Sequence, residues 1–431
     1  MVISLIGFAV VLVLAFLGIP LAFAILSVGV FGFVYLRGAE AAMSMSAQWV
    51  VDSVTNYNFS VIPLFILMGG FIHHSGISRD LFSASYAWLG RFRGGLAMSG
   101  VVSCAGFSAV CGSSLATAAT MTRVAVPSMR EYRYNEGFSA GTIAAGGTLG
   151  IMIPPSVPMA IYGIIAGEDI GKLFIAGMLP GLMLIMLFLL AIIVVTAFNP
   201  ALGPAGRKLR LQEAIKASYA TWPVIILFAL VLGGIYSGIT TPTEAAAIGA
   251  FGAWLLGAFK GHFLSFSELG KVFVETVKST SMIFMIVIAA LILNQFINMT
   301  GMPFQLVGLV NDLNLTPLGL VLAICVICLL MGMVFESLGI LLLIIPVFLP
   351  SLSALGVDLL WFGVIAILVI ELGLISPPIG MNVFAVRAVA SDIKLTHIFA
   401  GVMPYIVAML IGLVLLFLFP EIATWLPSAM R

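Results

Sequence analysis

Residues 144–163 read AAGGTLGIMIPPSVPMAIYG, an apolar segment that is interrupted by Gly146, Gly147, Gly150 and the pair Pro154-Pro155. Each proline removes a backbone N–H and clashes with the preceding turn, so we predict that a helix breaks here. In the hydrocarbon of a membrane, the backbone groups that a break frees are tolerated only where protein, an ion or a water-filled cavity satisfies them. The segment therefore predicts a functional break in a membrane span.

The same interruption returns 223 residues later, in ELGLISPPIGMNVFAV at residues 371–386. Gly373 takes the position of Gly150 in this register, and Pro377-Pro378 takes that of Pro154-Pro155. Other matches at nearly the same spacing are FIHHSGISRDL (71–81) with FINMTGMPFQL (296–306), Asp169-Ile170 with Asp392-Ile393, and Gly177 and Pro180 with Gly401 and Pro404. Such distant matches favour an internal duplication. Two Gly/Pro-broken spans at corresponding places in two halves indicate the binding site of a secondary transporter.

The composition predicts a membrane protein. Of the 431 residues, 62% are hydrophobic and 8% are charged, whereas soluble proteins carry about 25% charged residues. We therefore predict an all-α polytopic membrane protein. The net charge of +1 gives no indication of a nucleic-acid partner. The sequence has no HExxH, GxSxG, Walker or Rossmann pattern, so we predict neither an enzyme nor an ATP-driven pump.

We assign residues 1–200 to a first repeat. Its expected segments are two spans in 2–36 with a turn at Gly18-Ile19-Pro20, a polar connection marked by Arg37, Glu40 and Asp52, a span over 61–77, an amphipathic interfacial helix over 79–93, a hairpin over about 94–127, a broken helix over 136–165 and a plain span over 172–198. His73 and His74 end a span and are interpreted as interface residues. A basic linker, residues 201–220, is expected to lie in the cytoplasm.

The second repeat, residues 221–431, is expected to follow the same plan. Its segments are spans over about 221–238, 242–259 and 278–298, a hairpin over about 315–352 and a broken helix over 358–386. In GITTPTEAAAIGA (238–250), Thr241 is predicted to cap a helix and to form a capping box with Glu244. This local explanation gives Glu244 a structural role, so we do not assign it to a binding site.

The distribution of positive charge predicts opposite orientations for the two hairpins. Arg91 and Arg93 precede the first hairpin and Arg130 follows it, so both of its ends are expected to face the cytoplasm. No Lys or Arg occurs between Lys278 and Arg387, so both ends of the second hairpin are expected to face the periplasm. We therefore predict two inverted-topology repeats, each with a re-entrant hairpin and a broken transmembrane helix.

The first hairpin tip, residues 108–114, offers hydroxyl and carbonyl oxygens near the middle of the membrane. We expect it to meet unwound backbone around Gly147, Thr148 and Gly150. Neutral oxygens without a full carboxylate suit a weakly held monovalent cation better than Ca²⁺ or Mg²⁺. The alternative is that these small residues serve only helix packing.

The second hairpin tip, MGMVFES at residues 331–337, carries Glu336. An ionisable residue deep in a membrane is a functional-site hypothesis by default, although a glutamate can also cap the N-terminus of a half-helix. Further oxygens are expected from the second broken span, at Glu371, Gly373, Ser376 and Asn382. Broken helices also direct N–H groups into the cavity, which favours an anionic substrate.

Four motifs carry a family resemblance: GITTPTEAAA (238–247), GFSAVCGSSLATAAT (106–120), GGTLGIMIPPSVPMAIYG (146–163) and ISPPIGMNVF (375–384). Over essentially the whole chain, the sequence resembles the large membrane (M, DctM-like) subunit of TRAP transporters. The resemblance implies an elevator-type carrier of the ion transporter superfamily, driven by a sodium gradient, in a bacterial inner membrane. It implies two partners, a small four-helix membrane subunit and a soluble periplasmic substrate-binding protein.

The resemblance also implies two sodium sites. Residues at the first are Ser113, Ser114, Gly147, Thr148 and Gly150, and residues near the second are Gly332, Glu336, Gly373 and Ser376. Substrate-binding residues are expected between the tips and the breaks, at Ser108, Pro154, Pro155, Ser156, Pro377, Pro378 and Asn382. Cys111 stands where the family commonly has a small hydroxylated residue, and Glu336 stands where aspartate is common.

We therefore predict the transport subunit of a sodium-coupled, binding-protein-dependent importer of organic anions such as C4-dicarboxylates or sialic acid. It needs no cofactor other than sodium as the coupling ion. The alternatives are a stand-alone sodium- or proton-coupled anion carrier and a non-transporting subunit of a membrane complex. The sequence does not identify the anion, because much of the selection would lie in the binding protein.

Overall fold

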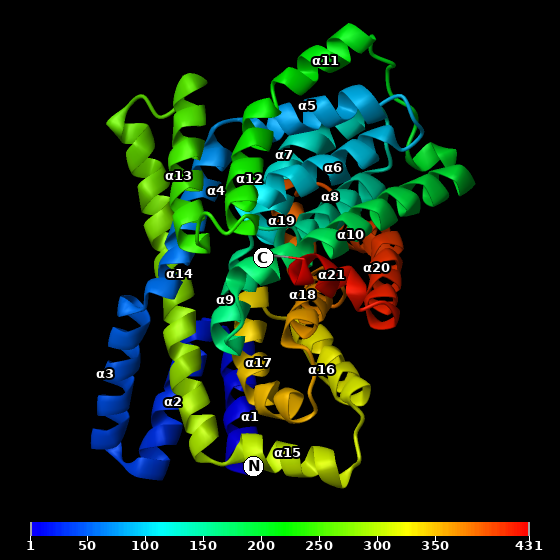
Figure 1. Cartoon of the computed structure of the whole chain (residues 1–431). Helices are drawn as coiled ribbons and strands as arrows, with labels where there is room; N and C mark the ends of the chain where they lie inside the picture. The colour runs from blue at the N-terminus through cyan, green and yellow to red at the C-terminus, as the bar shows by residue number, and fades with distance from the viewer. Residues whose placement is uncertain (1, 430–431) are drawn as a thin grey trace.

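The computed structural model describes residues 2–429, which form helices and connecting turns (Figure 1). The first half contains α1 (Val2–Phe16), α2 (Leu21–Arg37), α3 (Ala39–Thr55), the 3-10 turn Tyr57–Ser60, α4 (Val61–His74), α5 (Ile77–Leu89), α6 (Gly95–Cys111), α7 (Ser114–Glu131), α8 (Glu136–Met152), α9 (Val157–Ala166) and α10 (Ile170–Phe198). The remainder contains α11 (Leu211–Tyr219), α12 (Trp222–Tyr236), α13 (Pro242–Phe259), α14 (Phe266–Met299), α15 (Met302–Asp312), α16 (Pro317–Gly332), α17 (Ser337–Ala354), α18 (Leu359–Ile375), α19 (Met381–Val389), α20 (Leu395–Leu418) and α21 (Glu421–Ser428).

Several helices have the length and apolar composition of membrane spans. Among the described residues, α10, α14, α17 and α20 are long and apolar enough to cross a membrane individually. Three pairs of helices are long and apolar enough to cross a membrane when each pair is counted as one bent span. The bend is 57° between α3 and the segment that ends with α4, 41° between α8 and α9, and 50° between α11 and α12. The all-helical polytopic membrane fold predicted from composition is confirmed.

Both predicted hairpins are present as helix pairs with short breaks. Gly112, with φ +65°, ends α6, and Ser113 caps α7 by accepting a hydrogen bond from the Ala116 N–H at 3.3 Å. The left-handed backbone at Gly112 is one that glycine adopts without a steric penalty. In the second hairpin, residues 333–336 separate α16 from α17. The chain therefore reverses at both predicted tips.

Both predicted broken helices are interrupted at their proline pairs. The first break covers residues 153–156 and the second covers 376–380. Gly147, Thr148 and Gly150 remain helical in α8, so the expectation of unwound backbone at these three residues was wrong. The reason is that a proline disrupts the turn immediately before it, whereas glycine only lowers helix propensity and close packing overrides that preference. Pro154-Pro155 and Pro377-Pro378 are both joined by cis peptide bonds.

Three other boundaries differ from the sequence prediction. The expected polar connection after Arg37 is the helix α3, because its alanine-rich segment has high helix propensity despite Glu40 and Asp52. The span expected over 278–298 belongs to the longer α14, which Ser265 caps by accepting from the Glu268 N–H at 3.2 Å. The basic linker contains α11, which packs against α5. By contrast, the capping box of Thr241 and Glu244 is confirmed.

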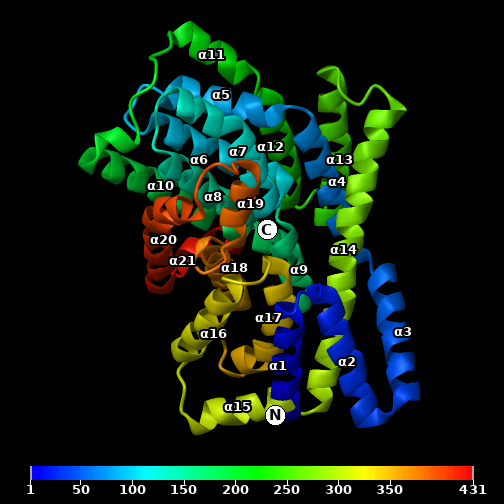
Figure 2. The same ribbon diagram turned by 180° about the vertical axis from the view of Figure 1, so that it is seen from behind.

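The arrangement of the helices fits the predicted inverted repeats. The turns before α5 and α15 both pass through a left-handed glycine, Gly76 and Gly301, at corresponding places in the two halves. These two helices lie at opposite ends of the molecule, each beside one hairpin: α5 contacts α6 and α7, and α15 contacts α17 (Figures 1 and 2). The hairpins thus enter the molecule from opposite ends.

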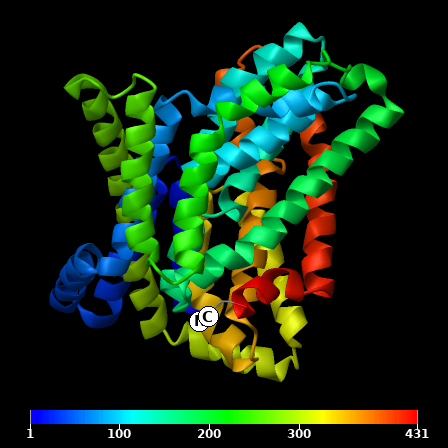
Figure 3. The same cartoon turned by 45° about the horizontal axis from the view of Figure 1, so that its top comes forward.

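Between the two ends, the helices form two groups. One group pairs α14 with α2 and α4, and α13 with α4, while the other packs α8 against α6, α7 and α20. Figure 3 shows α13 and α14, in yellow-green, on the side of the molecule opposite α20, in red, with the broken helices between them. The close approach of α8 to α20 depends on Gly141 and Gly401, since a Cβ on either would overlap backbone of the other helix.

Candidate functional site

A cavity of about 370 Å³ lies where the two hairpin tips meet. Its lining combines both tips, the ends of the broken helices, and one face each of α4 and α14. The polar or glycine members are Gly69, Gly70, His73, Gly112, Ser113, Ser114, Glu275, Thr276, Ser279, Glu336 and Ser337. Apolar side chains such as Ile66, Ile283 and Leu374 complete the wall. A small cavity with apolar walls and few polar groups is typical of a site for a small molecule.

The first hairpin tip packs directly on α8 through glycines. A Cβ on Gly147 would lie 2.9 Å from the Ser114 carbonyl oxygen, and a Cβ on Gly150 would lie 2.9 Å from the Ser108 hydroxyl oxygen. Similarly, a Cβ on Gly112 would lie 3.1 Å from the carbonyl oxygen of Pro155. The structure therefore brings Ser113, Ser114, Gly147 and Gly150 together, although α8 is not unwound there.

Thr148 is oriented differently from its neighbours on α8. Its hydroxyl donates to the Ala145 carbonyl at 2.6 Å and lies 4.0 Å from the sulfur of Met409 on α20. The structure thus does not bring the Thr148 hydroxyl to the hairpin tip, because neighbouring residues of a helix point in different directions.

The second hairpin tip approaches α18 in the same way. A Cβ on Gly332 would lie 3.0 Å from the Cα of Gly373 and equally close to the Ile370 carbonyl oxygen. Glu336 stands at the N-cap of α17, but its side chain makes no capping hydrogen bond and instead lines the cavity. Ser376 lies at the end of α18, where its hydroxyl donates to the Leu372 carbonyl at 2.7 Å.

The seven residues predicted to bind substrate are not among those that line the cavity: Ser108, Pro154, Pro155, Ser156, Pro377, Pro378 and Asn382. Ser156 instead caps α9 by accepting from the Met159 N–H at 3.3 Å. Asn382 donates to the Ala144 carbonyl at 3.3 Å, and so joins the second broken helix to the first. Pro154 and Pro155 are buried, whereas Pro377 and Pro378 are exposed.

Sequence reasoning missed the side of the cavity formed by α4 and α14. His73 contacts Thr120 of the first hairpin, with 3.0 Å between its Nδ1 and the threonine hydroxyl. The neighbouring His74 lies 3.5 Å from Glu275 of α14. The sequence associates His73 and His74 only with the end of a span, and their meeting with Glu275, about 200 residues away, is visible only in three dimensions.

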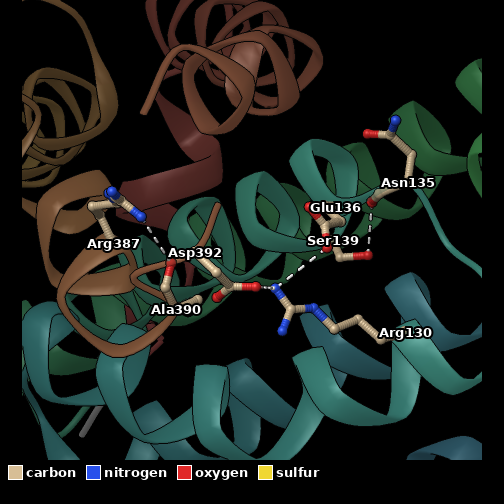
Figure 4. Close-up of polar contacts among 7 residues, drawn as sticks. All are labelled: Arg130, Asn135, Glu136, Ser139, Arg387, Ala390 and Asp392. Carbon is tan, nitrogen blue, oxygen red and sulfur yellow. Dashed lines mark hydrogen bonds and ion pairs between the residues drawn. The ribbon is translucent and has the colours of Figure 1, made fainter. Parts of the chain in front are cut away.

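A group of ion pairs joins the first hairpin to the second half of the chain (Figure 4). Arg130, in the last turn of α7, pairs with Asp392 in the loop before α20 and lies 3.4 Å from Glu136 of α8. The backbone N–H of Asp392 itself and the Arg130 guanidinium hold the pKa of Asp392 below its ordinary value. Nearby, Arg387 donates to the Ala390 carbonyl at 3.5 Å. These contacts couple the two broken-helix regions.

Comparison with known proteins gives consistent results over nearly the whole chain. The family model described as "Tripartite ATP-independent periplasmic transporter, DctM component" matches residues 8–422. The C4-dicarboxylate TRAP transporter large permease protein DctM of Pseudomonas aeruginosa is 33% identical, with 92% of each chain covered. The sialic acid TRAP transporter large permease protein SiaM of Vibrio cholerae is 31% identical, with 96% of each chain covered.

Two further comparisons concern a longer relative and a solved structure. The isethionate TRAP transporter permease protein DctMQ of Oleidesulfovibrio alaskensis is 32% identical; the match covers 94% of this chain and 63% of that relative. The crystal structure of the Alcanivorax borkumensis YdaH transporter matches with a TM-score of 0.63, covering 90% of both chains at 16% identity. At this identity, the likeness to YdaH concerns the fold alone.

Proposed function

The chain belongs to the DctM family of tripartite ATP-independent periplasmic transporters, and from this premise we propose that it couples the import of an organic anion to the entry of sodium. As a member, it is a multi-pass inner-membrane transporter permease and not an enzyme. The observation that carries the proposal is the cavity to which both hairpin tips contribute. A site shared by two tips from opposite ends can be reached from either side of the membrane as the surrounding helices move.

The polar groups of the cavity support sodium as the coupling ion. Ser113 and Ser114 contribute neutral oxygens at one tip, and Glu336 contributes a carboxylate at the other. These tip residues supply mostly neutral oxygens, whereas Ca²⁺ and Mg²⁺ take six or more oxygen ligands. Such a set suits a monovalent cation that must bind and leave in each cycle.

An organic anion is the substrate class that the cavity favours. The N-termini of α7 and α17 begin at its wall, and the partial positive charge of a helix N-terminus attracts anions. A volume of about 370 Å³ is enough for a small organic acid. The relatives named for C4-dicarboxylates and for sialic acid make these two anions the first to test.

We further propose an elevator movement with two protein partners. The hairpins and broken helices would move as one unit, because α8, α18 and α20 pack together with them, against the group formed by α2, α4, α13 and α14. The partners would be a small membrane subunit and a periplasmic substrate-binding protein. The longer relative DctMQ, of which this chain covers 63%, is compatible with a second membrane subunit.

The proposal is tested by uptake into proteoliposomes that contain both membrane subunits. Radiolabelled C4-dicarboxylate or sialic acid is supplied outside with the binding protein, under an inward gradient of sodium or of choline. We expect accumulation with sodium and no accumulation with choline or without the binding protein. Equal accumulation without the binding protein would instead identify a stand-alone carrier, and uptake driven by a pH gradient alone would reject sodium coupling.

A further inference from the structure

Glu371 is a fully buried acid that the proposed transport cycle does not yet use. It lies on α18 one turn before the second break, and its residue surface is 0% exposed. Among the described residues, no hydrogen-bond donor reaches either oxygen of its carboxylate with good geometry. A buried polar group without a partner is rare in proteins and needs an explanation such as an ion.

The surroundings of Glu371 belong to both hairpin tips. The polar groups near enough to influence its carboxylate are the Ser114 hydroxyl, at the first tip, and Glu336, at the second tip. Ser114 and Glu336 both line the cavity, as does Leu374, which lies on the same helix as Glu371. A side chain of the second half thus reaches the first hairpin.

Three large polar side chains on helices that pack against α18 are engaged elsewhere and offer Glu371 no counter-charge. Tyr162 of α9 donates to the Leu359 carbonyl, Tyr405 of α20 bonds to the Thr142 hydroxyl, and Arg387 of α19 donates to the Ala390 carbonyl. None of the ion pairs among the described residues includes Glu371 or Glu336. Two acids thus interact in an apolar interior without a basic partner, an arrangement that strongly favours a bound cation.

The corresponding position in the first half of the chain carries no acid. Thr148 occupies the position 223 residues earlier on α8, which corresponds to that of Glu371 on α18. The Thr148 hydroxyl is satisfied by the Ala145 carbonyl, whereas the Glu371 oxygens are free. Of these two corresponding positions, only the one on α18 carries an ionisable side chain.

We propose that Glu371 is a sodium ligand that acts together with Ser114, so that the cation site at the first hairpin tip is built across the two halves of the chain. This inference rests on the proposed sodium coupling and adds a charged ligand to it. One carboxylate and one sodium ion form a neutral pair, which can cross the membrane interior at much lower cost than the carboxylate alone. The ion would thereby determine when the mobile helices can move.

The test measures sodium binding without transport, as the rise in the thermal unfolding midpoint of the purified complex of both membrane subunits. Sodium is titrated at constant ionic strength against choline for the wild type, Glu371→Gln and Glu421→Gln. Glu421 is an exposed glutamate at the start of α21, so it provides the same chemical change away from the site. We expect the half-saturating sodium concentration to rise about tenfold to 100-fold in Glu371→Gln, and to stay unchanged in Glu421→Gln.

Folding of the variant is checked in the same experiment. Without sodium, Glu371→Gln should unfold at or above the wild-type temperature, because it lacks the buried unpaired charge. Glu371→Asp, which keeps the charge on a shorter side chain, should keep part of the sodium response. If Glu371→Gln responds to sodium as the wild type does, Glu371 is not a sodium ligand, and the proposed sodium coupling is unaffected. A wild-type complex that does not respond to sodium overturns the proposed sodium coupling as well.

Discussion

At the scale of single residues, two glycines of α8 determine how closely the first hairpin tip can approach. Because Gly147 and Gly150 have no side chain, the Ser114 carbonyl oxygen and the Ser108 hydroxyl oxygen can lie close to the α8 backbone. A Cβ at either glycine would come too close to these oxygens. At the second hairpin tip, Gly332 and Gly373 allow an equally close approach between the tip and α18. Close backbone contact of this kind keeps carbonyl and hydroxyl oxygens near each other without a large polar side chain.

Removing the Ser114 hydroxyl should weaken sodium binding. If it is a ligand, Ser114→Ala loses one buried polar interaction of about 1–3 kcal/mol, which corresponds to about a 5- to 150-fold higher half-saturating sodium concentration. Thr148→Ala is the matched control, since its hydroxyl already donates to the Ala145 carbonyl and should not affect sodium dependence. Sodium-dependent uptake in proteoliposomes measures both variants. Unchanged sodium dependence in Ser114→Ala would indicate that this serine serves packing only.

At the scale of helices, the contact of α8 with α20 holds the two broken-helix regions together. Gly137, Gly141 and Gly401 bring the two backbones into direct contact, and Arg130 adds its ion pairs to Asp392 and Glu136 at the same end. Exposed ion pairs contribute little to stability, so the glycine contact is expected to dominate. We therefore expect the packing of α8 on α20 to depend on this small-residue interface.

A methyl group at this interface should destabilise the protein. Gly401→Ala would place its Cβ against the Gly137 carbonyl oxygen, and overpacking of this kind costs about 1–3 kcal/mol. Gly233→Ala on α12 is the control, because nothing lies within 4 Å of the position of its Cβ. Thermal unfolding of the purified protein should show a lower midpoint for Gly401→Ala alone. An unchanged midpoint would mean that α8 and α20 can separate without loss of stability.

The sequence predicted the helix breaks better than it predicted the cavity. Pro154-Pro155, Pro377-Pro378 and the Gly112 tip act on the local backbone, so their effects could be read from the residues themselves. The cavity wall depends on tertiary contact between α4 and α14, and no local pattern marks His73 or Glu275 for it. The extent of α8 was also misjudged, because packing against α7 decides whether its glycines stay helical.

At the scale of the whole molecule, we expect the two hairpins to enter from opposite sides of the membrane. The basic segment before α11 lies at one end, and α15, in the interval that lacks Lys and Arg, lies at the other (Figure 1). From the positive-inside rule we expect α11 to lie in the cytoplasm and α15 at the periplasmic surface. The first hairpin would open from the cytoplasm and the second from the periplasm.

Labelling of single cysteines tests this orientation. In a variant without the four native cysteines, Asp312→Cys at the end of α15 should react in intact cells with a thiol reagent that does not cross the inner membrane. Arg210→Cys, at the start of α11, should react only after the membrane is opened. Both native residues are exposed, so access to the reagent does not depend on burial. Reaction with the reverse sidedness would contradict the inverted arrangement.

The most direct test of sodium-coupled import is to measure sodium and substrate entry together in the same proteoliposomes. With both membrane subunits, the binding protein and radioactive sodium present, we predict that sodium enters only when the organic anion is supplied, in a constant ratio to it. Ser114→Ala and Glu371→Gln should reduce both fluxes together. Anion entry without sodium entry, or sodium entry at the same rate with and without the anion, would contradict sodium-coupled import.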